Sequence, residues 1–137
     1  MLRITKENME QCLKDVYIHD CDMLSIKQDF EEQRIEIYME NHYTDIMKRY
    51  TITFIDALYF ESSNYSPWYS GHQVNTMWCE EPTLFSRLLN LPDEWGTGDH
   101  ANLPDSSEDF IQPSIQFRSG DRIRILCKAV EVEEAPL

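Results

Sequence analysis

The sequence predicts a single α+β domain, in which a mostly antiparallel β-sheet carries an N-terminal helix and a short second helix. Two patterns indicate this fold class. Apolar residues alternate with polar ones in several segments, and two other segments repeat their apolar residues at helical spacing. A length of 137 residues fits one domain, 1–137, and no repeat or linker divides it.

The first predicted element is the N-terminal helix, which Thr5 caps. Its apolar residues recur at i, i+3, i+4 and i+7 and form one stripe: Met9, Cys12, Leu13 and Val16. The helix is expected to end near Asp15, because the β-branched and aromatic residues that follow favour a strand.

A β-hairpin is expected next, because two alternating segments flank a short polar one. The inward residues are Leu24, Ile26 and Phe30 in the first strand and Ile35, Ile37 and Met39 in the second. The register closes only with an even loop, 31–34 or the tighter 32–33. In that register Phe30 lies opposite Ile35, and Ile26 lies opposite Met39.

A third strand covers 50–60, where Asp56 breaks the alternation at a bulge or at the sheet rim. A weaker strand around Val74 and Trp78 precedes a short helix over 84–89, which Pro82 and Pro92 delimit. Residues 92–109 are rich in acids and in glycine, proline and serine, which predicts a long, mobile acidic loop.

The last predicted element is a hairpin around Ser119-Gly120-Asp121. A three-residue loop is favoured because it sets apolar residues opposite each other, with Phe117 facing Ile123 and Ile115 facing Ile125. Val130 and Val132 have the opposite parity, which predicts a final strand covered on both faces.

The charge is strongly acidic, with a net value of −13. Between residues 50 and 117 Arg87 is the only base, against ten acids. Such a field attracts cationic surfaces and repels nucleic acid and anionic membranes. A basic protein partner is therefore expected, contacted by these acids: Glu80, Glu81, Asp93, Glu94, Asp99, Asp105, Glu108 and Asp109.

The aromatic loop 59–69 is a second candidate contact surface, because Tyr and Trp in a turn-rich segment can stack on a ligand or bind a cation. Its candidate contact residues are Tyr65, Trp68 and Tyr69. Small-ligand binding there is one alternative function, and a loop that folds its aromatics over the sheet is the simpler structural interpretation.

The segment His19-Asp20-Cys21-Asp22 is the densest group of reactive side chains. Together with a third ligand from His42, His72 or Glu80, it suggests a metal site or a metal-dependent enzyme centred on His19, Asp20 and Asp22. The competing interpretation is that Asp20 and Asp22 fix a turn through bonds to backbone amides. The sequence has no recognisable nucleophile motif or phosphate-binding loop, so no catalytic residue and no cofactor are predicted.

The segments Ile18-His19-Asp20, Leu24-Ser25-Ile26 and Tyr50-Thr51-Ile52-Thr53-Phe54, joined by a hairpin, resemble small bacterial proteins grouped with the immunity proteins of polymorphic-toxin systems. The resemblance covers about residues 16–60. It implies a cytosolic protein that neutralises a toxin domain by binding it, without catalysis. It leaves the partner-binding residues unassigned.

The leading hypothesis is therefore an acidic, cytoplasmic protein-interaction module that binds a basic partner. A cytoplasmic location fits the polar first residues, which lack the apolar segment of a signal peptide. It also fits four scattered cysteines, which are expected to be reduced thiols.

Overall fold

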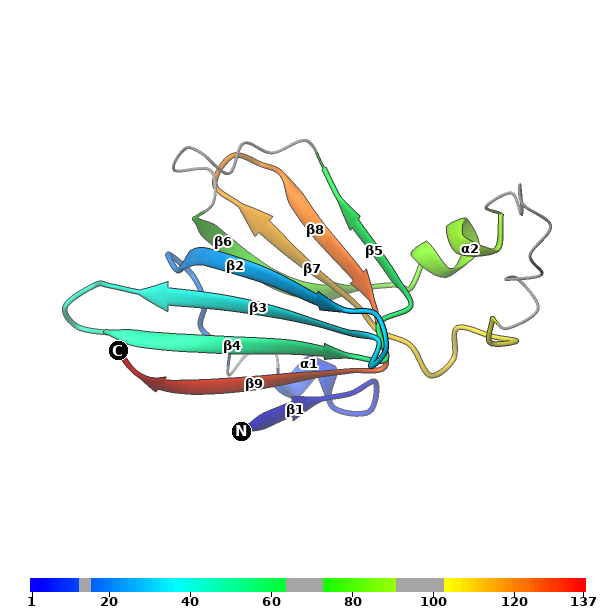
Figure 1. Cartoon of the computed structure of the whole chain (residues 1–137), viewed down its shortest axis with the longest axis horizontal. Coiled ribbons are helices and arrows are strands. Elements are labelled where there is room, and N and C mark those ends of the chain that lie inside the picture. Colours follow the sequence, from blue (N-terminus) through cyan, green and yellow to red (C-terminus); the bar gives the residue numbers. More distant parts are fainter. Residues whose placement is uncertain (13–15, 64–72, 91–102) are drawn as a thin grey trace.

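The computed structural model describes residues 1–12, 16–63, 73–90 and 103–137, which form two antiparallel β-sheets (Figure 1). Sheet A has the strand order β1-β9-β4-β3-β2, and sheet B has the order β5-β8-β7-β6. The strands are β1 (Leu2–Ile4), β2 (Asp22–Asp29), β3 (Arg34–Asn41), β4 (Lys48–Ile55), β5 (Tyr59–Ser62), β6 (Val74–Glu80), β7 (Gln112–Phe117), β8 (Arg122–Leu126) and β9 (Ala129–Pro136). Two helical segments are α1 (Met9–Cys12) and α2 (Leu84–Leu89).

The predicted α+β class is wrong. The described residues form two sheets, and their helical segments have only four and six residues. Neither segment is long enough to cover a sheet as a helical layer, so neither the N-terminal helix nor the second helix has the predicted role.

The N-terminal helix is replaced by a strand and a turn. β1 pairs with β9 and buries Ile4 completely. A turn follows, in which Asn8 Oδ1 accepts a hydrogen bond of 2.7 Å from the Thr5 amide, and α1 is a single helical turn. Pairing with the edge of β9 has outweighed the local helical pattern, whose continuation at 13–15 lies outside the described residues.

The two sheets face each other across one hydrophobic core. Fully buried side chains come from both, including Ile37, Ile52 and Phe54 of sheet A and Ile115 and Ile123 of sheet B. The arrangement is a β-sandwich whose sheets are joined at their corners. In the described ranges no helix is long and apolar enough to span a membrane.

One corner is made by two chain segments that bend together from one sheet into the other. β8 continues into β9, and β4 leads into β5 through Asp56, which has a φ of 51°. Two backbone hydrogen bonds stabilise the bend. Lys128 N donates to Ile55 O at 3.0 Å, and Leu58 N donates to Leu126 O at 2.8 Å. The bend changes which alternate side chains point into the core. The final strand was predicted to be covered on both faces, but the segment forms two strands, β8 and β9, in different sheets.

The predicted registers of both hairpins need correction. The loop covers residues 30–33 and pairs Asp29 with Arg34, which sets Ile26 opposite Ile37. A bulge between Met23 and Ser25 then shifts the register, so that Met23 lies opposite Met39. In the last hairpin Ile115 lies opposite Ile123, because the turn is closed by the Phe117 amide donating to Asp121 O at 2.9 Å. Gly120, with a φ of 91°, supplies the left-handed position of that turn.

Candidate functional site

The predicted contact residues divide between described and undescribed parts of the chain. Five acids can be placed: Glu80, Glu81, Asp105, Glu108 and Asp109. Six other candidates lie outside the described residues: Tyr65, Trp68, Tyr69, Asp93, Glu94 and Asp99. Of the same aromatic segment, Tyr59 and Phe60 belong to β5, where both pack partly buried against the core.

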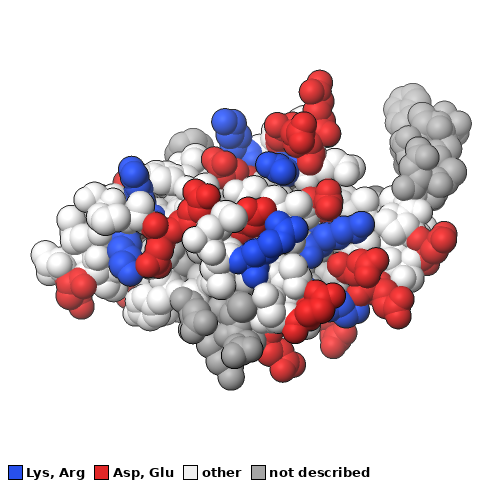
Figure 2. Space-filling view, turned by 90° about the horizontal axis from the view of Figure 1, so that it is seen from below, with Lys and Arg blue, Asp and Glu red and all other residues white. Residues whose placement is uncertain are grey.

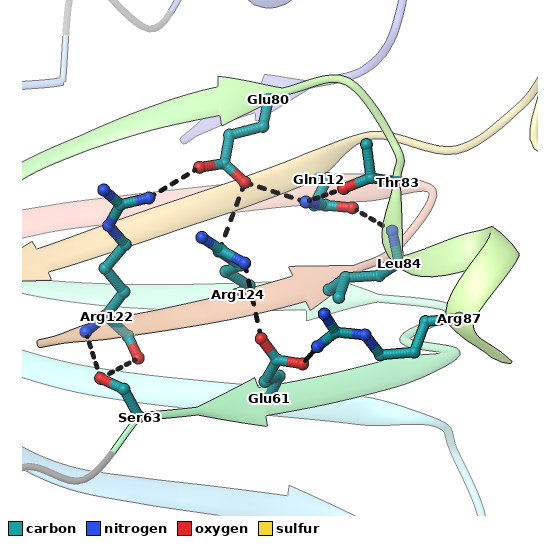
Figure 3. Close-up of polar contacts among 9 residues, drawn as sticks. All are labelled: Glu61, Ser63, Glu80, Thr83, Leu84, Arg87, Gln112, Arg122 and Arg124. Atoms are coloured by element: carbon teal, nitrogen blue, oxygen red, sulfur yellow. Dashed lines mark hydrogen bonds and ion pairs between the residues drawn. The ribbon is translucent and has the colours of Figure 1, made fainter. Parts of the chain in front are cut away.

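The outer face of sheet B carries a network of ion pairs that runs across β5, β8 and β6 (Figure 3). Glu80 lies 3.5 Å from both Arg122 and Arg124, and Arg124 lies 3.5 Å from Glu61. Glu61 also pairs with Arg87 of α2. Glu61 and Glu80 therefore have cationic neighbours within the chain, and these arginines reduce the net negative charge of this face.

Gln112 connects this network to the start of α2. Its side chain is fully buried, and its Nε2 donates to Glu80 Oε2 at 2.9 Å. Its Oε1 accepts a hydrogen bond of 2.8 Å from the Leu84 amide (Figure 3). Sequence reasoning missed Gln112, and the available signal was an amide side chain between the apolar residues Phe110, Ile111 and Pro113.

A cavity of about 730 Å³ lies between α1, the end of β6 and the segment before β7. We call it the acidic cavity. Four acids and one base line it: Glu10, Glu80, Glu81, Glu108 and Lys6. Its apolar lining is Met9, Cys79, Pro82, Phe110 and Ile111.

The acidic cavity brings together two groups of predicted contact acids that are far apart in the sequence. Glu80 and Glu81 follow β6, whereas Glu108 precedes β7. Within the described part of the chain, the carboxylates of Glu81 and Glu108 have no hydrogen-bond or ion-pair partner, and both residues are exposed. Lys6 donates its ammonium to the Glu108 carbonyl oxygen, so a cation already lies at the rim.

Other parts of the surface mix both signs of charge. On the face seen from below, basic side chains lie among acidic ones (Figure 2). Two pairs of sheet A have this character: Arg3 lies 2.7 Å from Glu131, and Lys48 lies 3.1 Å from Glu134. Exposed pairs of this kind contribute about 0–1 kcal/mol each, and they also neutralise the acids locally.

His19, Asp20 and Asp22 lie at the second corner, where the start of β2 meets the start of β6. Asp20 Oδ2 is 2.9 Å from His19 Nδ1, and its Oδ1 is 2.6 Å from Arg118 Nη2. Both oxygens thus engage side chains, where backbone amides were expected. Desolvation raises the pKa of Asp20, but the bonds from His19 and Arg118 outweigh it and leave the pKa below its ordinary value.

The backbone conformation at this corner explains why an aspartate occupies position 20. Asp20 has a φ of 67°, a left-handed conformation that Asp tolerates better than most residues. Its amide donates to Val74 O at 2.9 Å, and the Val74 amide donates to Cys21 O at 2.8 Å. Asp20 therefore joins the two sheets. In the described ranges no three His, Cys, Asp or Glu side chains gather as a set of metal ligands.

The described thiols are protonated at neutral pH. Burial raises the pKa of Cys21 to about 12 and that of Cys79 to about 11, and it also raises the pKa of the fully buried Cys127. A nucleophilic cysteine needs a lowered pKa, so these three side chains are suited to packing.

Apolar side chains that sequence reasoning assigned to the core are exposed along β2. The exposed fraction is 52% for Leu24, 39% for Ile26 and 82% for Phe30. Ile26 lies on the core-facing side, opposite the buried Ile37, but no strand of the described residues covers it. Residues 24–30 are all exposed, so this edge of sheet A is open to solvent.

Compared with protein-family models, with curated proteins and with solved structures, the chain matches none of them. The resemblance to immunity proteins is therefore untested.

Proposed function

We propose that this chain is a non-catalytic protein-interaction module that binds a basic partner protein. We propose further that the acidic cavity receives a lysine or arginine side chain of that partner. The observation that carries the proposal is the meeting of Glu81 and Glu108, both without a charged partner among the described residues, above an apolar lining.

The chemistry of the cavity favours a long cationic side chain. Met9, Pro82 and Phe110 can contact the aliphatic stem, while the carboxylates of Glu81 and Glu108 accept hydrogen bonds from its charged end. Glu80 is less available, because Arg122 and Arg124 already surround it. Carboxylates at this position favour basic partners and exclude acidic ones.

The overall charge supports the same class of partner. A net charge of −13 raises the encounter rate with basic proteins and disfavours contact with nucleic acids. An immunity-type role, in which the partner is a toxin domain, and a cytoplasmic location are consistent with this proposal and belong to it.

The proposal is tested with heptapeptides that carry lysine, arginine or norleucine at a fixed central position and random apolar or small residues elsewhere. Binding is measured by fluorescence anisotropy. We expect selection of lysine or arginine over norleucine by about tenfold or more, which corresponds to the loss of one charged contact. The double variant Glu81→Gln/Glu108→Gln is expected to lose this preference.

A matched control removes two exposed acids away from the acidic cavity, Asp45→Asn in the turn after β3 and Glu133→Gln of β9, and changes the net charge equally. We expect the control to keep the preference for lysine and arginine. Equal binding of the lysine and norleucine peptides by the native protein would contradict the proposal.

A further inference from the structure

The open edge of β2 points to a mode of binding. β2 has one neighbour, β3, so alternate backbone amides and carbonyls of β2 point away from the sheet. Among the described residues, the bridge on its other side joins Asp22 to Gln73 at the corner. From residue 24 to residue 29 the edge is exposed and unpaired within the described residues.

We propose that β2 receives an extended segment of the basic partner as an additional antiparallel or parallel strand of sheet A. This inference rests on the proposed function for the charge of the partner, and it adds the site and the mode of contact. Main-chain hydrogen bonds supply the affinity in such strand addition, and alternate side chains supply the specificity.

The two faces of the edge require two different kinds of side chain. On the core-facing side, Ile26 is 39% exposed, and the bulged Leu24 beside it is 52% exposed. On the solvent side, β2 itself presents Lys27 and Asp29, and Glu36 of β3 lies opposite Lys27. A strand that alternates apolar and basic residues places its apolar side chains beside Ile26 and its basic side chains on the face that carries Asp29 and Glu36.

The end of the edge offers an anchor for an apolar side chain. Phe30 begins the β2–β3 loop and is 82% exposed. The loop is held in place, because Asp29 Oδ1 accepts hydrogen bonds from the amides of Glu31 (3.1 Å) and Glu32 (3.0 Å). Between this loop and the segment Leu58–Phe60 lies a hollow of about 210 Å³, a volume suited to a single side chain.

A second copy of this chain fits the edge less well than a basic segment. Two molecules with a net charge of −13 each repel one another. The bulge between Met23 and Ser25 also hinders edge-to-edge pairing of identical sheets.

The test uses a decapeptide of alternating valine and lysine with blocked ends, and it measures affinity by fluorescence anisotropy and amide hydrogen exchange by NMR. Strand addition predicts that the peptide slows exchange of the outward amides between residues 24 and 29. Two N-methylated peptides are compared, one modified at its odd-numbered residues and one at its even-numbered residues. One of them is expected to lose binding and the other to keep it, because only one set of peptide amides faces β2.

The double variant Leu24→Ser/Phe30→Ser is expected to weaken this peptide by about tenfold or more, since it removes two exposed apolar contacts without changing the core. Leu89→Ser is the matched control, because Leu89 of α2 is 47% exposed. We expect Leu89→Ser to bind as the native protein does.

The outcomes separate this inference from the proposed function. Peptide binding that Glu81→Gln/Glu108→Gln weakens, but that Leu24→Ser/Phe30→Ser and N-methylation leave unchanged, would overturn strand addition and keep the basic-partner proposal. Strand addition that persists when valine–threonine replaces valine–lysine would support the edge and contradict the charge requirement. A dimer in sedimentation experiments that Phe30→Ser abolishes would overturn the choice of a basic segment as occupant.

Discussion

Gln112 is the residue on which the polar organisation of sheet B depends. Its buried amide satisfies the first amide of α2 and one oxygen of Glu80 at once, through bonds of 2.8 and 2.9 Å. Glu80 is thereby held beside Arg122 and Arg124, and it takes part in the structure as well as lining the acidic cavity. The carboxylate of Glu81, its neighbour in sequence, has no ion-pair or hydrogen-bond partner among the described residues, and we propose that it contacts the partner protein.

Replacing Gln112 by methionine keeps the volume of the side chain but removes its hydrogen bonds. The Leu84 amide is then left buried without a partner, which costs about 1–3 kcal/mol of unfolding free energy. Urea denaturation followed by fluorescence measures this loss. The control is Gln116→Met, because Gln116 lies on the same strand and is half-exposed. Equal denaturation midpoints for Gln112→Met and the native protein would contradict the assigned role.

The residue scale also shows what a single sequence can reveal about the site. Glu80, Glu81 and Glu108 were among the predicted contact residues because a one-sided charge distribution is visible in composition alone. That Glu80 is paired whereas Glu81 is free depends on the positions of Arg122 and Arg124, about 40 residues away in sequence. Alternation predicts neither contact, because it reports only on neighbours along the chain.

At the scale of elements, the alternating segments correctly indicated antiparallel strands, and errors arose where pairing partners decide the outcome. Met9 and Val16 of the predicted helical stripe pack against the core, but Val16 lies outside the single helical turn of α1. The free edge of β9 offered β1 a pairing that burial of Ile4 stabilises, and the helix is confined to a single turn. Likewise, the bend after β8 and the bulge in β2 shift parity, and alternation alone does not reveal them.

A mutation can test whether residues 2–4 form a strand of sheet A or an unpacked segment before a helix. Ile4 is fully buried between the sheets, so Ile4→Ala is expected to lower the unfolding free energy by about 2–5 kcal/mol. Leu2→Ala, at a half-exposed position of the same strand, is expected to cost less. Both are measured by urea denaturation at one protein concentration. An Ile4→Ala midpoint equal to that of the native protein would show that β1 is not part of the core.

Across the whole molecule, some acids are paired with cationic side chains and others lie in a region that has few bases. Acids of sheets A and B are often paired with arginine or lysine, whereas Glu81, Glu108 and the exposed Asp105 and Asp109 lie in the part of the chain with a single base. Long-range attraction depends on the net charge of such a region, while the binding contact depends on particular carboxylates. The two effects are therefore separable by mutation.

The last prediction separates them. Five further acids of this part of the chain, none of them among the described lining residues of the acidic cavity, are Asp93, Glu94, Asp99, Asp105 and Asp109. Neutralising them to the corresponding amides should slow association with a lysine-containing heptapeptide by about tenfold or more at low salt. With Glu81 and Glu108 as the proposed contact, the dissociation rate should change little, because other charges act mainly on encounter. Stopped-flow fluorescence measures both rates across ionic strength. The association rates of variant and native protein should converge near 1 M salt, where the Debye length falls to about 3 Å. Identical association rates at low salt would mean that these acids do not steer the partner, and that only the carboxylates of the cavity select it.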